Sequence, residues 1–133
     1  MGFLGDKYSK KFLLSGLYFF RGIILILFLF LQASSITAIG FGIGFGFLWL
    51  ATIPATFGIV AQIFGVKYLT MLSGIVFLSH QFGSFAGAYL GGYFYDQLGS
   101  YDYAWYISIG LSFFATLMHL PIDERPITRV RNA

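Results

Sequence analysis

The strongest constraint on this sequence is an apolar run of 28 residues, Tyr68–Tyr95, that contains no charged side chain. A helix of about 20 apolar residues is long enough to cross the hydrocarbon core of a bilayer. Across the whole chain, 58% of the 133 residues are hydrophobic and 10% are charged, whereas about 25% are charged in an ordinary soluble domain. The sequence therefore predicts an integral membrane protein.

Three further apolar runs accompany this one, and together they predict an all-α fold with four transmembrane helices. We expect a single transmembrane unit over residues 1–133, with helices at about residues 12–33, 36–64, 68–95 and 103–120. A polar loop at residues 1–11 and a polar tail at residues 121–133 flank the helices. The first run is too long for the apolar core of a secretory signal, which has about 7–15 residues.

The basic residues predict how the helices are oriented in the bilayer. Four crossings place both termini and the turn around Lys67 on one side, together with seven of the eight Lys and Arg residues. The opposite side then carries no Lys or Arg, but two carboxylates, Asp96 and Asp102. Because Lys and Arg are retained on the cytoplasmic side, we expect a multi-pass protein of the plasma or inner membrane with both termini cytoplasmic.

Composition and spacing also exclude several classes of function. The net charge of +3 does not indicate nucleic-acid binding, because the basic residues cluster at the ends of the apolar runs. The chain has no cysteine, which excludes disulfides and thiolate metal sites. The sequence shows no paired carboxylates, metal-ligand cluster or nucleophile triad. We therefore expect neither an enzyme nor a bound metal or cofactor.

Small residues recur at helical spacing in two of the runs. Gly83, Gly87 and Gly91 are four residues apart, so they lie on one face of a helix. Gly42 and Gly46 have the same spacing in the second run. Helices in lipid associate through close backbone contact at such faces. We predict that these five glycines are helix-packing positions, with a flexible hinge as the alternative for Gly42 and Gly46.

The second run carries a row of aromatic and hydroxyl side chains. Phe45, Trp49, Thr52 and Thr56 are spaced 4, 3 and 4 residues apart, which places them on one helical face. Pro54 weakens the helix beside them by removing a backbone hydrogen bond. This arrangement predicts that Trp49, Thr52 and Thr56 contact a solute near mid-membrane. The alternative is a packing helix whose threonines bond their own backbone carbonyls.

Polar side chains also interrupt the first and third runs. His80 and Gln81 lie near the middle of the third run, where polar groups are costly and usually functional. We include both as candidate substrate-binding residues. His80 could also relay a proton or bind a carboxylate, or hold a neighbouring helix as a neutral imidazole. Arg21 lies inside the first run, and we expect its side chain to extend toward the cytoplasmic surface, with a buried partner as the alternative.

Two stretches of the chain resemble the major facilitator superfamily of transporters. The first, from Gly2 to Lys11, is similar to the loop signature of that family, in which a glycine is followed after three residues by an acid and a base. Gly2, Asp6, Lys7 and Lys11 match the signature, whereas Ser9 replaces its second glycine. The resemblance implies that Asp6, Lys7 and Lys11 belong to cytoplasmic gating pairs.

The second stretch, Gly87–Tyr101, is similar to the end of the eleventh helix in the superfamily's monocarboxylate-porter-like bacterial members. In those proteins a small-residue helix runs into a Tyr-Asp-x-x-Gly-Ser-Tyr turn. The resemblance implies that the four runs correspond to helices nine to twelve of a twelve-helix fold. It further implies part of a secondary transporter for a small organic solute, an anion such as a monocarboxylate. That part would dock on missing N-terminal helices and be inactive alone.

A second hypothesis belongs to a different class of protein. The chain could be a stand-alone four-helix membrane scaffold, subunit or small pore that assembles through its glycine faces. Coding sequence that continues in frame upstream of Met1 through further apolar runs would favour the transporter. A stop codon at that place, with a stable oligomer in detergent, would favour the stand-alone protein.

Overall fold

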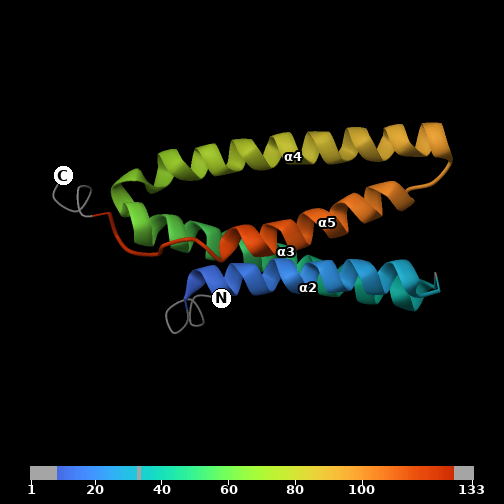
Figure 1. The fold of residues 1–133 in the computed structure, drawn as a ribbon, viewed down its shortest axis with the longest axis horizontal. Coiled ribbons are helices and arrows are strands. Elements are labelled where there is room, and N and C mark those ends of the chain that lie inside the picture. The colour runs from blue at the N-terminus through green and yellow to red at the C-terminus, as the bar shows by residue number, and fades with distance from the viewer. Residues whose placement is uncertain (1–8, 33, 128–133) are drawn as a thin grey trace.

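The computed structural model describes residues 9–32 and 34–127, which form four long helices without a strand among them. The helices are α2 (Lys10–Phe30), α3 (Ser35–Phe64), α4 (Leu69–Leu98) and α5 (Asp102–His119), and a short 3-10 helix, η1 (Val66–Tyr68), joins α3 to α4. Successive helices run in opposite directions, so both ends of the described chain lie at the same end of the molecule (Figure 1). The all-helical class with four helices is confirmed.

Local signals in the sequence set several of the helix ends. Ser34 precedes α3, where its Oγ accepts a hydrogen bond from the Thr37 backbone N–H at 3.2 Å. In return, the Ser34 N–H donates to Thr37 Oγ1 at 2.9 Å, which completes a capping box. Gly65 and Gly99 follow α3 and α4 with positive φ values of 79° and 68°. Glycine adopts these angles without a steric penalty, so both helices end there.

The buried core lies where α2 packs against α3 and α5. It is built from Leu14 and Leu17 of α2 and from small or branched residues of α3, namely Ala51, Ala55, Ile59 and Val60. Three glycines, Gly22, Gly44 and Gly58, allow close approach between helices. A Cβ at Gly22 would lie 3.1 Å from the Phe113 ring of α5, and a Cβ at Gly44 would lie 3.3 Å from Ile24. The glycines that carry contacts are therefore different from those chosen by spacing alone.

Helix α4 stands apart from this core. None of its residues is buried, and Figure 1 shows it running along one side of the other helices. A Cβ added at Gly83, Gly87 or Gly91 would meet no atom of another part of the described chain within 4 Å, and the same holds for Gly42 and Gly46. Within residues 9–32 and 34–127, no other helix packs against these five glycines. Their role in helix packing stays a prediction, which would need helices outside the described residues.

Membrane-crossing character is clearest in the first three helices. In the part of the chain that the structure describes, α2, α3 and the segment Val66–Leu98 are long and apolar enough to span a bilayer. Helix α5 has 18 residues, with Asp102 in its first turn and His119 in its last, and it is outside this set. It nevertheless lies along α2 (Figure 1). A fourth crossing by α5 stays a prediction.

The described part of the tail folds back across the start of α2. The Glu124 carboxylate accepts hydrogen bonds from Ser9 Oγ at 2.8 Å and from the Lys11 backbone N–H. The Glu124 carbonyl accepts from Gln62 Nε2 at 3.1 Å, and Lys10 Nζ donates to Gln62 Oε1 at 2.7 Å. A negative charge at a helix N-terminus is favourable because the first N–H groups there have no partner within the helix. Glu124 thus caps α2 from the other end of the chain.

Replacing Gly22 by leucine should destabilise the contact between α2 and α5. The new side chain must displace the Phe113 ring, and overpacking of this kind costs about 1–3 kcal/mol. Gly16→Leu on the same helix is the matched control, because a Cβ at Gly16 would meet no atom of another described helix within 4 Å. SDS titration of the purified chain in mixed micelles measures both variants. Equal stability of the two would contradict a close contact at Gly22.

Replacing Glu124 by alanine should lower the free energy of unfolding by about 1 kcal/mol, because two donors at the start of α2 lose their acceptor. Asp123→Ala is the control, since the Asp123 carboxylate contacts only the neighbouring Arg125 in the described tail. Hydrogen exchange followed by mass spectrometry should show faster exchange in the first turn of α2 for Glu124→Ala alone. Unchanged exchange there would show that the cap does not form.

Candidate functional site

The threonines of α3 use their hydroxyl hydrogens within their own helix. Thr52 Oγ1 donates to the Leu48 carbonyl at 2.9 Å, and Thr56 Oγ1 donates to the Thr52 carbonyl at 2.9 Å. The hydroxyl hydrogens of Thr52 and Thr56 are therefore used as in the alternative of a packing helix, in which the threonines bond backbone carbonyls of their own helix. A hydroxyl oxygen retains lone pairs after donating. Both oxygens remain suited to accept a hydrogen bond from a second donor.

Arg21 supplies such a donor to Thr52. Its Nη2 atom donates to Thr52 Oγ1 at 3.0 Å. The guanidinium Cζ also lies over three rings, at 5.0 Å from Tyr18, 5.4 Å from Phe45 and 5.1 Å from Trp49. These five residues, Tyr18, Arg21, Phe45, Trp49 and Thr52, form what we call the Arg21 cluster. The expected extension of Arg21 toward the cytoplasmic surface is wrong, because ring faces and a hydroxyl on α3 attract the cation.

The Arg21 cluster lacks a negative charge among the described residues. The described residues include four acids, and none of them is in the cluster. Asp96 and Asp102 lie at the ends of α4 and α5, and Asp123 and Glu124 lie in the tail. The Nε atom of Arg21 is buried and has no hydrogen-bond partner in the described chain. A charged side chain at the centre of a membrane helix costs about 2.5–3.5 kcal/mol on insertion scales. A cation kept at this cost without a counter-ion among the described residues makes Arg21 a candidate functional residue.

A series of aromatic rings connects the cluster to α4. The Trp49 and His80 rings meet edge to face with centroids 5.6 Å apart. His80 Nδ1 also lies 3.5 Å from Ser84 Oγ one turn further along α4. The structure thus brings Trp49, Thr52 and His80 into one neighbourhood, whereas Gln81 is exposed on α4 and Thr56 bonds its own helix.

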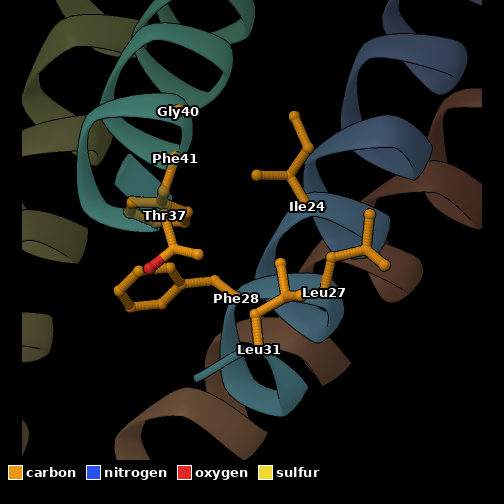
Figure 2. Close-up of a pocket in the computed structure, with 7 residues that line it drawn as sticks. All are labelled: Ile24, Leu27, Phe28, Leu31, Thr37, Gly40 and Phe41. Carbon is orange, nitrogen blue, oxygen red and sulfur yellow. The ribbon is translucent and has the colours of Figure 1, made fainter. Parts of the chain in front are cut away.

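A small cavity lies beside the cluster, between the end of α2 and the start of α3. Its volume is about 220 Å³, and Figure 2 shows its lining residues, which are Ile24, Leu27, Phe28, Leu31, Thr37, Gly40 and Phe41. The Phe28 and Phe41 rings are 4.3 Å apart, and Phe41 stacks on Phe45 of the cluster at 5.2 Å. The cavity is therefore an apolar neighbour of the Arg21 cluster. None of the five residues predicted to bind solute lines it.

Comparison with known proteins gives one decisive result. A family model described as Major Facilitator Superfamily matches residues 1–133. The chain belongs to the major facilitator superfamily. Proteins of this family are transporters rather than enzymes, and the long apolar helices agree with a multi-pass membrane protein. No curated protein and no solved structure was found to match.

The superfamily's loop signature lies mostly outside the described residues. Asp6 and Lys7 are outside them, and Lys11 is the one proposed gating residue that the structure places. Its backbone N–H binds Glu124, and its ammonium lies 5.3 Å from the centroid of the Phe12 ring. Gating by Asp6, Lys7 and Lys11 stays a prediction, as do the numbering as helices nine to twelve and the monocarboxylate-porter-like subtype.

Arg21 is the residue of this superfamily member that the site prediction left out. The sequence showed an arginine inside an apolar run with Tyr18 three residues before it, so both lie on one helical face. That spacing indicated a cation beside a ring. It could not show that α3 would place Thr52, Phe45 and Trp49 around the same guanidinium, because the pairing depends on how α2 and α3 pack.

Proposed function

We propose that this chain is part of a secondary active transporter that moves a small organic solute across the cell membrane by alternating access. The observation that carries the proposal is the mid-helix cluster of Arg21, Trp49 and Thr52 in a chain of the major facilitator superfamily. Transporters of this kind bind solute near the midplane, between two halves that rock against each other. A cluster of polar and aromatic groups at that depth fits such a site.

Helix α4 supports the idea that this unit docks on further helices. It has no buried residue and exposes Phe77, Phe82, Phe85 and Tyr89 by more than half. Its glycine face, Gly83, Gly87 and Gly91, is open. We infer that N-terminal helices of the same transporter cover α4, and that the unit does not transport without them. Rocking at this interface would open the solute site to each side in turn.

The solute we propose is a small organic anion, with a monocarboxylate as the class to test first. The likeness of Gly87–Tyr101 to the monocarboxylate-porter-like members supports this class. Trp49, Thr52 and Thr56 would contact the solute from α3. His80 and Gln81 would add polar contacts from α4, and His80 is the group proposed for coupling to protons.

Alanine substitution of Trp49 or Thr52 should weaken uptake in the transporter that contains this chain. Loss of one hydrogen bond costs about 0.5–1.5 kcal/mol, so Thr52→Ala should raise KM by about 2- to 10-fold, and Trp49→Ala by about 10-fold or more. Initial rates with radiolabelled lactate, normalised to membrane abundance, measure both. Leu50→Ala and Ser108→Ala are the controls, because both side chains are exposed outside the cluster. Unchanged kinetics would remove Trp49 and Thr52 from the site.

An impermeant amine-reactive reagent should leave Lys67 unlabelled in intact cells, because the proposed orientation places η1 on the cytoplasmic side. Opening the cells should then expose Lys67 to the reagent. Ser100→Lys provides the matched control, since this position follows α4 at the opposite end and should be labelled from outside. Peptide mass spectrometry reads both sites. Labelling of Lys67 in intact cells would contradict the proposed orientation and place η1 on the extracellular side.

A second candidate function is a stand-alone four-helix membrane scaffold, subunit or small pore. The same open face of α4 supports it, because a second copy of the chain could cover that face. Further apolar runs encoded in frame upstream of Met1 would decide for the transporter. A stop codon there, together with a stable oligomer of the purified chain, would decide for the scaffold.

A further inference from the structure

The donors of Arg21 are only partly used. A guanidinium carries five N–H groups in a planar fork. Within the described residues, Nη2 binds Thr52 Oγ1, whereas the buried Nε has no hydrogen-bond partner. The rings of Tyr18, Phe45 and Trp49 attract the positive charge but accept no conventional hydrogen bond. A buried N–H without an acceptor is costly, so an additional acceptor would stabilise this arrangement.

The Thr52 hydroxyl holds the fork in a defined orientation. Its proton is committed to the Leu48 carbonyl at 2.9 Å, so its oxygen can only accept from Arg21. This acceptor role fixes one edge of the guanidinium against α3. Besides its proposed contact with the solute, Thr52 therefore positions Arg21, which is the group that presents unused donors and charge.

We propose that Arg21 binds the carboxylate of the transported solute, so that α2 supplies the residue that selects a singly charged anion. A carboxylate matches the planar fork with two parallel hydrogen bonds. One anion balances the single cation of the Arg21 cluster, whereas a second carboxylate on the solute would find no further cation among the five residues of that cluster. This inference rests on the proposed transport function and assigns the charge-selecting residue of that site.

The surroundings of Arg21 indicate what the rest of the anion looks like. The Phe45 and Trp49 rings flank the guanidinium, and the Phe41 ring connects Phe45 to the cavity of about 220 Å³. That cavity is lined by aliphatic and aromatic side chains, with Thr37 as its hydroxyl residue (Figure 2). A compact apolar body attached to one carboxylate would pack against the Phe45 and Trp49 rings that flank the cation. Benzoate has both features and serves as the probe.

Equilibrium binding of radiolabelled benzoate to the purified chain in lipid nanodiscs tests this assignment. We expect saturable binding that unlabelled benzamide, the neutral analogue of the same shape, does not displace. Arg21→Gln should weaken benzoate binding at least 10-fold, because hydrogen bonds to charged partners are the strong ones. Arg21→Lys keeps the charge but loses the fork, so its loss should be smaller than that of Arg21→Gln.

Lys67→Gln is the matched control, because it removes one positive charge from η1, away from the Arg21 cluster, and should change binding less than 2-fold. Circular dichroism and elution volume establish that each variant is folded. Benzoate binding that is unsaturable, or equal in wild type and folded Arg21→Gln, would overturn the assignment. Equal competition by benzamide would also overturn it.

The outcome separates this inference from the proposed function. Uptake of neutral solutes that is insensitive to Arg21→Gln would leave a transporter standing and remove Arg21 as its anion-binding residue. Benzoate binding that depends on Arg21, in a protein whose complete form transports no solute, would keep the anion site and remove the transport function.

Discussion

Lipid offers apolar helices no hydrophobic reason to associate, and this constraint explains which contacts hold the present helices together. Helix α2 meets α5 where Gly22 admits the Phe113 ring, and it meets α3 beside Ala51 and Ala55. Polar contacts supply the rest, since small side chains and hydrogen bonds are what membrane helices use to associate. The bond from Arg21 to Thr52 belongs to both the packing of α2 on α3 and the candidate site.

This double role accounts for an otherwise costly arrangement. A guanidinium near the middle of α2 would destabilise a helix that served packing alone. The surrounding rings and the Thr52 oxygen lower that cost without removing the charge. In the proposed transporter, a charge at this depth would lie where the solute binds. Arg21 therefore takes part both in the packing of α2 on α3 and in the proposed function.

Much of the fold could be predicted from sequence because length, hydropathy and turn residues act locally. The four helices follow from such signals, although the third continues to Leu98, beyond the expected end at residue 95. The site was only partly accessible, since helical spacing placed Trp49 and Thr52 on one face but could not align Arg21 with them. Spacing also favoured Gly83, whereas contact depends on which helix lies opposite, as at Gly22. Residues distant in sequence therefore determine which glycines are packed and which side chains surround Arg21.

The Glu124 cap on α2 has a consequence for biogenesis. Its carboxylate binds groups 115 and 113 residues earlier in the chain. When α2 leaves the ribosome, Glu124, which completes its first turn, has not yet been synthesised. The N-terminal turn of α2 lacks this carboxylate acceptor until translation reaches the tail. A segment that is synthesised after α5 thus completes the N-terminal turn of α2.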